Sequence, residues 1–314
     1  MFTIDKEEFI GRDYVCMRDF TPEQISYMLE VATQLKAERK AGIPHPILQG
    51  KSLGMIFTKS STRTRVAFEV GIYQLGGQAL FLSSRDIQLG RGEPIADTAR
   101  VLSRMVDGIM IRTYSHQEVL DLAQYATIPV INGLTDLLHP TQVLADLLTI
   151  QEHKGRLAGL KMTYVGDGNN MAHSLLIGGA KMGLHVVIAS PEGYKPDPEI
   201  VALAKVEAQK YGGQIEVVDN PLEAVRNADV LYSDVWASMG QEEEAAIRRK
   251  AFKGYQINSE VLKLAAKDAI VLHCLPAHRG EEITEEVFEG PQSVVFDEAE
   301  NRLHAHKAIM ALVM

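Results

Sequence analysis

A run of hydroxyl and guanidinium side chains, Ser61-Thr62-Arg63-Thr64-Arg65, has the chemistry to bind a phosphate group. It precedes a helical pattern, so Ser61 and Thr62 are expected at a helix N-terminus, where backbone N–H groups and the helix dipole favour an anion. Arginines in a first helical turn oppose the dipole unless an anion compensates them, and their forked donors match phosphate oxygens. A capped helix with solvated arginines is the structural alternative. The segment is not a P-loop, because Leu53 and Thr58 occupy its glycine positions.

Two other polar segments offer carboxylates, amides and a hydroxyl to a small ligand: Asp167-Gly168-Asn169-Asn170 and Asp234-Val235-Trp236-Ala237-Ser238-Met239-Gly240. The first follows a strand pattern, but the third glycine of a dinucleotide fingerprint would fall at Met171, so a nicotinamide cofactor is not expected. An Asn-rich turn is the structural alternative there. The second segment ends in a glycine and suits an ammonium-bearing substrate under a mobile lid. Its alternative is a helix N-cap before Glu242–Glu244.

Cys274 lies in the segment HCLPAHRGEE (273–282). A lone cysteine is usually inert core, and a nucleophilic one needs an activating partner. Adjacent residues of a strand point to opposite faces, so His273 is not an automatic base and a covalent thiol mechanism is not favoured. His304 and His306 diverge on a helix because they are two residues apart, and neither H-E-x-x-H nor C-x-x-C occurs. No metal site is therefore expected.

The overall composition narrows the class of protein. The 314 residues include 32 Lys and Arg against 41 Asp and Glu, a net charge of −9, which argues against a nucleic-acid partner or a polybasic membrane binder. No apolar run approaches the roughly 18 residues that span a bilayer, and the acidic N-terminus does not resemble a signal peptide. The two cysteines are too few for a disulfide framework. A cytoplasmic enzyme is the expectation.

The segments that must position these residues alternate between extended and helical patterns. Strands are expected at 53–57, 79–82, 108–112, 129–132, 162–166, 185–189, 215–218, 230–234 and 270–275. Helices are expected from a capping box at Thr21 to Gly42 and at 63–75, 94–106, 116–125, 139–153 and 299–314. This order predicts an α/β protein of two domains, each a parallel β-sheet flanked by helices, with residues 1–138 in the first and 139–298 in the second. Helix 299–314 is expected to pack back on the first domain.

The polar segments share one property: each follows a predicted strand. Ligands of open α/β sheets bind at the carboxyl ends of strands, so we expect the active site in the interdomain cleft.

The sequence resembles the aspartate/ornithine carbamoyltransferase family, and within it the ornithine enzymes, from residue 15 to the C-terminus. The resemblance rests on the segments SSTRTR (60–65), HPTQ (139–142), DGNN (167–170), DVWASMG (234–240), HCLPAHRGEE (273–282) and DEAENR (297–302). The first two are shared with aspartate enzymes, whereas HCLP and SMG are much more specific: the aspartate enzymes have a proline after this histidine and lack SMG, and putrescine enzymes typically lack SMG.

The resemblance implies that the carbamoyl group of carbamoyl phosphate is transferred to the δ-amine of L-ornithine, giving citrulline and phosphate without a metal or organic cofactor. It implies catalytic roles for Arg112, His139 and Cys274, which polarise the carbonyl or orient the amine. The implied carbamoyl phosphate site comprises Ser61, Thr62, Arg63, Thr64, Gln88, Arg112, His139, Gln142, Cys274, Leu275 and Arg302. The implied ornithine site comprises Asn170, Asp234, Ser238 and Met239.

The family also implies a homotrimer or a multiple of trimers, in which Gln88 reaches a neighbouring subunit's site. The chain departs from many relatives at Arg91-Gly92, so the ligand contacts of that loop stay open. Two alternatives remain: a carbamoyltransferase for another amine, such as putrescine or an acylated ornithine, and a non-catalytic binding protein of the same fold. The pair Arg112 and His139 favours catalysis, because an oxyanion needs stabilising donors only when the reaction proceeds.

Overall fold

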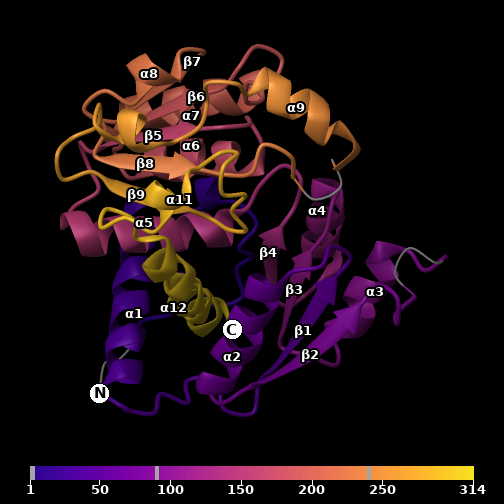
Figure 1. The fold of residues 1–314 in the computed structure, drawn as a ribbon. Helices are drawn as coiled ribbons and strands as arrows, with labels where there is room; N and C mark the ends of the chain where they lie inside the picture. Colours follow the sequence, from indigo (N-terminus) through magenta and orange to yellow (C-terminus); the bar gives the residue numbers. More distant parts are fainter. Residues whose placement is uncertain (1–3, 89–91, 239–241) are drawn as a thin grey trace. The chain divides into compact units, whose positions relative to one another are not determined.

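A computed structural model describes residues 4–88, 92–238 and 242–314 (Figure 1). The chain forms two compact units, one from Met1–Leu148 with Glu300–Met314 and the other from Thr149–Ala299. We call them the first and the second unit. Across the described ranges, no helix has the length and apolar character needed to cross a membrane.

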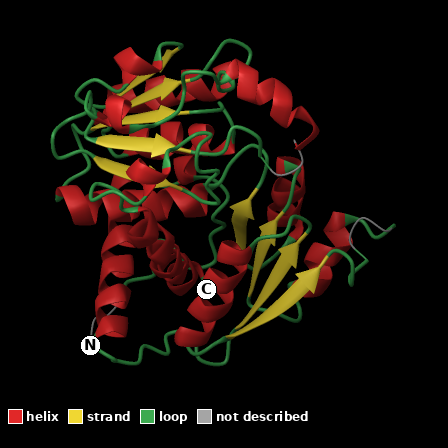
Figure 2. Cartoon of the chain, viewed as in Figure 1, coloured by secondary structure: helices red, strands yellow, loops and turns green. Residues whose placement is uncertain are grey.

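The first unit contains a four-stranded parallel sheet in the order β2-β1-β3-β4 (Figure 2). Its strands are β1 (Ser52–Phe57), β2 (Gln78–Ser83), β3 (Gly108–Arg112) and β4 (Val130–Leu134). Its helices include α1 (Pro22–Lys40), α2 (Thr62–Gln74), α3 (Ile95–Leu102) and α4 (His116–Tyr125). All five residues of β3 and of β4 are buried, as expected for central strands covered on both faces. Apolar side chains of β1, β3, α3 and α4 form one core cluster.

The second unit contains a five-stranded parallel sheet in the order β7-β6-β5-β8-β9. Its strands are β5 (Lys161–Val165), β6 (His185–Ala189), β7 (Gln214–Val218), β8 (Val230–Ser233) and β9 (Ile270–His273). Its helices include α6 (Asn170–Lys181), α7 (Pro198–Tyr211), α8 (Pro221–Ala224), α9 (Ala245–Ala251), α10 (Ser259–Leu262) and α11 (Glu285–Phe288). Helices α6 and α7 pack on each other and against β6 and β7. The two parallel sheets with flanking helices confirm the predicted fold class, and the nine strands within the described residues lie where the sequence predicted them.

Two long helices contribute residues to both units: α5 (Pro140–Lys154) and α12 (Val295–Val313). Helix α12 begins four residues before the predicted start at 299, because Val294 already accepts a backbone hydrogen bond from Glu298. Asp297 and Glu298 then lie in the first turn, where their charges favour the helix dipole. The predicted helix 94–106 is shorter than expected and ends at Leu102.

Each sheet has a point at which successive connections leave in opposite directions. Strand β1 lies between β2 and β3 in the first sheet, and β5 lies between β6 and β8 in the second. Where the connections after two neighbouring strands run in opposite directions, a crevice forms at the carboxyl ends of the strands. Ligands of α/β sheets bind in such crevices. The predicted phosphate-binding run follows β1, and Arg112 ends its neighbour β3. Asp167 follows β5, and Asp234 follows its neighbour β8.

Candidate functional site

The run predicted to bind phosphate begins α2, as its helix-start pattern indicated. Ser61 is the N-cap, and its hydroxyl accepts a hydrogen bond from the backbone N–H of Thr64 at 3.1 Å. Thr64 is fully buried, and its own hydroxyl accepts from two guanidinium groups. Arg112 donates to it at 3.3 Å and Arg302 at 2.9 Å. The N-terminus of α2 therefore lies beside two buried cations.

Arg302 joins three helices of the first unit. It lies on α12, and its second terminal nitrogen donates to Oε1 of Gln142 on α5 at 2.5 Å. The amide of Gln142 is oriented in turn by Asp146, whose carboxylate accepts from it at 2.8 Å. Thr64, Arg112, Gln142 and Arg302 were predicted to share a ligand, and the structure brings them together although up to 238 positions separate them along the chain.

His139 precedes α5 and is 5% exposed. Burial lowers the pKa of its imidazole well below the ordinary value, and the nearby charges of Arg302 and Arg112 lower it further. At neutral pH the ring is therefore uncharged and can donate one hydrogen bond or accept one. His139 and the two arginines give the first unit a buried cluster with a net positive charge.

Lys59 belongs to the same cationic region, although we did not predict it as a site residue. It is 5% exposed, its Nζ lies 3.0 Å from a carboxylate oxygen of Asp136, and it stacks 4.9 Å from the ring centroid of Tyr114. Its position directly before Ser60 was the available signal. The sequence alone does not distinguish Lys59, because a lysine in a polar turn is ordinarily solvated.

In the second unit, Asp234 is the centre of a polar cluster and is 5% exposed. One carboxylate oxygen accepts from the side-chain amide of Asn169 at 2.9 Å. The other accepts from the backbone N–H of Val235 at 2.8 Å and from the thiol of Cys274 at 3.1 Å. Asn169 also caps α6, because its amide oxygen accepts from the backbone N–H groups of Met171 and Ala172. The sequence predicted roles for Asp234, Cys274 and Asn170, and the structure adds the hydrogen bond from Asn169 to Asp234.

A buried ion pair that the sequence did not reveal lies next to this cluster. Arg248 of α9 donates to the Asp167 carboxylate at 2.8 Å and to the backbone oxygen of Trp236 at 2.9 Å. Burial raises the pKa of Asp167 to about 6, and the charge of Arg248 opposes that rise. Nothing in the charged run around Arg248 distinguishes it from its solvated neighbours, so only the fold identifies this pair.

His273 supports the backbone around Cys274 from inside the unit. Its Nδ1 accepts from the N–H of Leu275 at 2.9 Å, so its proton lies on Nε2, which donates to Glu282 at 3.1 Å. The backbone N–H of His273 donates to Glu298 at 2.8 Å. Leu275 has a φ of 60°, a conformation that a non-glycine residue adopts only when its surroundings impose it. These contacts fix the carbonyl and thiol that follow β9.

A close approach explains one glycine of the DGNN segment. A Cβ at Gly168 would lie 2.2 Å from the backbone nitrogen of Pro196 and 2.6 Å from the carbonyl oxygen of Tyr194. Gly168 also donates its N–H to that oxygen at 2.7 Å. The glycine is therefore needed for packing against the 194–196 loop, and no dinucleotide has to be invoked.

The remaining predicted residues are placed as follows. Thr62 and Gln88 are exposed, while Arg63, Asn170 and Ser238 are half-buried. Met239 and Arg91 lie outside the described residues. Gln88 is thus on the surface of the first unit, in the stretch that follows β2.

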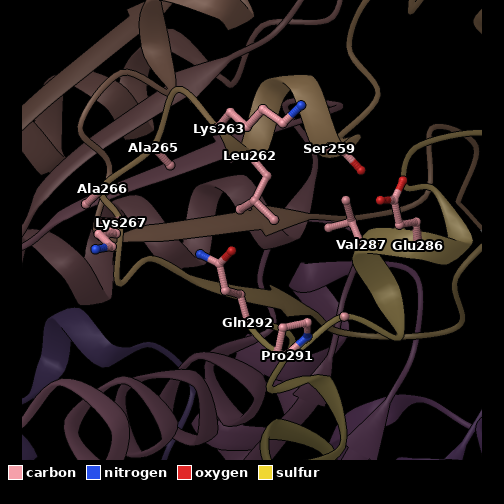
Figure 3. Close-up of a pocket in the computed structure, with 11 residues that line it drawn as sticks. Ser259, Leu262, Lys263, Ala265, Ala266, Lys267, Glu286, Val287, Pro291 and Gln292 are labelled. Carbon is pink, nitrogen blue, oxygen red and sulfur yellow. The ribbon is translucent and has the colours of Figure 1, made fainter.

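The second unit also has a cluster of possible metal ligands and a pocket, and neither includes the predicted site residues. His278, Glu281 and Glu282 place possible metal ligands within 4.8 Å of one another, but Glu282 accepts from His273 and Glu281 is paired with Arg249 at 2.8 Å. A pocket of about 470 Å³ is drawn in Figure 3. Its lining comes from α10, α11 and the residues before β9, whereas Cys274 follows the other end of β9.

The chain was compared with known families and structures. Residues 12–152 match the carbamoyl-P binding domain of aspartate/ornithine carbamoyltransferase, and residues 158–313 match the Asp/Orn binding domain of the same family. An ornithine carbamoyltransferase of Symbiobacterium thermophilum is 64% identical over 304 residues, which cover 97% of this chain and 98% of that protein.

Solved structures agree with these matches. Ornithine carbamoyltransferase from Pyrococcus furiosus superposes with a TM-score of 0.95 at 57% identity, covering 97% of both chains. The enzyme from Gloeobacter violaceus gives a TM-score of 0.87 at 50% identity, covering 98% of this chain and all of that one. With matches over nearly the whole chain and two family domains in order, the chain belongs to the aspartate/ornithine carbamoyltransferase family.

Proposed function

We propose that this protein transfers the carbamoyl group of carbamoyl phosphate to the δ-amino group of L-ornithine, giving L-citrulline and phosphate. The observation that carries the proposal is the cluster of Thr64, Arg112, Gln142 and Arg302, because it gathers two buried guanidinium groups at a helix N-terminus. Such a set suits a small dianion that also has a carbonyl to polarise. Names of relatives that are 57–64% identical over nearly the whole chain support ornithine as the acceptor.

The first unit provides the electrophile's site in this proposal. The N-terminus of α2, with Ser61, Thr62, Arg63 and Thr64, binds the phosphate. Arg112 and the neutral His139 donate to the carbamoyl oxygen, on which negative charge develops as the amine attacks the carbon. Collapse of the tetrahedral intermediate breaks the bond to phosphate, and the charge on the departing group is stabilised by Arg302.

The second unit provides the nucleophile's site. Asp234 binds the α-ammonium of ornithine, with Asn170, Ser238 and Met239 completing that site. Cys274 and the Leu275 carbonyl orient the δ-amine, which must lose its proton before it attacks because its pKa in water is close to that of lysine. Activity should therefore rise with pH through the neutral range. No metal or organic cofactor takes part in the proposed reaction.

The two domain roles follow from this assignment: the first unit, which includes His139 and Gln142, binds carbamoyl phosphate, and the second unit binds ornithine. That the active site lies in a cleft between the domains, closed by the 235–241 loop, stays a prediction, as does a cytoplasmic location. Positioning of both substrates, rather than covalent chemistry, supplies most of the rate in this proposal.

A single assay tests the proposed reaction. Purified protein is incubated with carbamoyl phosphate and L-ornithine, and citrulline and phosphate are measured. Parallel reactions replace ornithine with putrescine, N-acetylornithine or lysine at the same concentration. We expect citrulline and phosphate in equal amounts and little turnover of the other amines. A faster reaction with another amine would reassign the acceptor, and ligand binding without turnover would indicate a non-catalytic protein.

We further propose that the protein assembles as a trimer or a multiple of trimers. Apolar side chains are exposed on two adjacent elements of the first unit, α2 and β2, among them Tyr73 (78% exposed), Val66, Val70, Leu80 and Phe81. Exposed apolar groups gathered in this way are typical of an interaction surface. Gln88 follows β2 and is expected to complete the carbamoyl phosphate site of the neighbouring subunit.

Mixing two inactive variants tests whether sites are shared. Gln88→Glu sets a carboxylate against the phosphate of one ligand site, and Arg112→Ala damages the same site from the other chain. If sites are shared, subunit exchange between the two variants forms some sites with an intact Arg112 and an intact Gln88, and activity returns. No recovery, with exchange confirmed by mass, would mean that each subunit builds its site alone.

A further inference from the structure

His306 lies one helical turn after Arg302 on α12, so both side chains project from the same face of the helix. The Nε of Arg302 donates a hydrogen bond to Nε2 of His306 at 3.2 Å. The two terminal nitrogens of the same guanidinium donate to Gln142 and Thr64. Each of the three nitrogens of Arg302 therefore has an acceptor, and His306 supplies the one nearest the stem of the side chain.

This contact defines the protonation state of His306. A guanidinium can only donate, so Nε2 of His306 must present its lone pair, and the ring must be neutral with its proton on Nδ1. Burial lowers the pKa of the ring well below its ordinary value, and the charge of Arg302 lowers it further. A neutral acceptor is thus the state that both the geometry and the surroundings favour.

The ring is held in place by α2. It stacks on the fully buried Phe68 with a centroid separation of 4.2 Å and an interplanar angle of 24°. Phe68 lies one turn after Thr64 on that helix, so the surface that fixes the imidazole also carries the hydroxyl that accepts from Arg302. The two helices hold the guanidinium at its stem and at its end.

The other nitrogen of His306 suggests why this position carries a histidine. Nδ1 is buried and makes no hydrogen bond to any part of the chain that the structure describes. A buried donor without a partner costs stability, and a phenylalanine would stack on Phe68 without that cost. Packing alone therefore favours a phenyl ring here, whereas acceptance of the Arg302 hydrogen bond requires a nitrogen lone pair.

We infer that His306 is a positioning residue for carbamoyl phosphate: it orients the Arg302 guanidinium toward the ligand site without touching the ligand. This inference rests on the proposed function, because it assumes that Arg302 contacts carbamoyl phosphate. It assigns no role to the neighbouring His304, which is 2% exposed and bonds to Glu300 on its own helix. His304 thus provides a matched buried histidine on the same helix.

The test is a double-mutant cycle on His306 and Arg302, with calorimetric binding of carbamoyl phosphate and steady-state kinetics as readouts. We expect His306→Phe to weaken carbamoyl phosphate binding about tenfold, or about 1.4 kcal/mol, while the KM for ornithine changes less than about twofold. His306→Gln, whose amide oxygen can accept from Arg302, should recover most of that loss. In an Arg302→Ala background, His306→Phe should have no further effect. His304→Gln should leave both substrates' parameters unchanged.

The outcomes separate this inference from the proposed function. Wild-type protein that neither binds carbamoyl phosphate nor forms citrulline would remove the proposed function, and the inference with it. An active wild type in which His306→Phe weakens both substrates equally, or in which its effect persists without Arg302, would overturn the positioning role alone. Melting temperatures identify a folding defect, and if His306→Phe does not fold, the same cycle with His306→Gln and His306→Leu decides the matter.

Discussion

The two units use the same kind of sheet to build sites of opposite charge. At the carboxyl end of the first sheet lie the guanidinium groups of Arg112 and Arg302, with the neutral His139 nearby. At the corresponding end of the second sheet lie the carboxylates of Asp167 and Asp234. Asp167 follows β5, at which the connections change direction, and Arg112 ends β3, which lies beside the corresponding strand β1. Topology therefore determines where a ligand site forms, and a few side chains determine which charge the ligand must have.

The units also differ in the groups that contact their buried charges. In the second unit, Asp167 is paired with Arg248, and Asp234 accepts hydrogen bonds from three neutral donors. In the first, Arg112 and Arg302 both donate to the hydroxyl of Thr64. The first unit thus gathers guanidinium donors that suit an anionic ligand, whereas the carboxylate of Asp234 suits a cationic one.

The largest effect is expected from removing a cation of the first unit. Arg112→Ala deletes a donor aimed at the site where charge develops, and loss of one such donor lowers turnover by about 10²–10³-fold. We expect kcat/KM for carbamoyl phosphate to fall by about a thousandfold in citrulline assays. Arg104→Ala, at an exposed arginine of the same unit, is the control and should change little. Equal losses in both variants would remove the distinction between buried and surface cations.

The next largest effect is expected from removing the carboxylate of the second unit. Asp234→Ala leaves a bound ammonium without its partner, a loss of about 3–5 kcal/mol for a buried pair. Ornithine use should fall several hundred-fold or more, while carbamoyl phosphate binding changes little. Asp219→Asn, at an exposed carboxylate of the same unit, serves as the control. A titration in which both ligands weaken equally would contradict the separation of roles between the units.

A smaller effect is expected at Cys274, whose thiol donates to Asp234. Cys274→Ser keeps a donor of different length and should weaken ornithine use by about tenfold, which corresponds to about 1.4 kcal/mol. Turnover should persist, because the thiol orients the amine and does not attack the carbonyl. Single-turnover reactions analysed by mass spectrometry would detect a carbamoyl thioester on Cys274, and finding one would restore a covalent mechanism.

The smallest effect concerns stability in mild acid. Burial lowers the pKa of five histidines of the first unit below the ordinary value of 6.5, namely His45, His116, His139, His304 and His306. Protons then bind the unfolded chain more readily than the folded one, so the stability of this unit should fall as pH drops below 6.5. In the second unit the pKa of Asp167 is raised to about 6, so protonation of this group favours the folded state.

The difference in acid stability between the two units can be measured by amide hydrogen exchange, with the exchange of individual peptides monitored between pH 6.5 and 5. The rates are corrected for the intrinsic dependence of exchange on pH. Core amides of β3 and β4 should lose protection before those of β5 and β8. Simultaneous loss in both units would mean that the buried histidines do not control acid stability.

Much of the fold and several site residues could be predicted because local patterns encode them. Alternating strand and helix signals indicated parallel sheets, and the Ser61 cap was visible as a hydroxyl before a helical pattern. Arg112 and Asp234 were identified as residues at strand ends. The family resemblance added Gln142 and Arg302, which no local pattern marks.

Contacts between distant segments could not be predicted in the same way. Three contacts depend on which strands are neighbours and where each helix packs. They are the ion pair of Asp167 with Arg248, the hydrogen bond from Asn169 to Asp234 and the ion pair of Lys59 with Asp136. His306 illustrates the limit best: its spacing from His304 excluded a metal site, but its bond to Arg302 follows from the packing of α12 on α2.

The sequence by itself thus determined the order of strands and helices, the Ser61 cap of α2 and the residue types available to each proposed site. Those features depend on interactions between residues a few positions apart, which periodicity and capping reveal. Only the tertiary structure decided which of the many charged side chains are buried, which partner each one meets and which imidazoles are held neutral. Burial and long-range contact set those properties, because desolvation and neighbouring charges act through space and not along the chain.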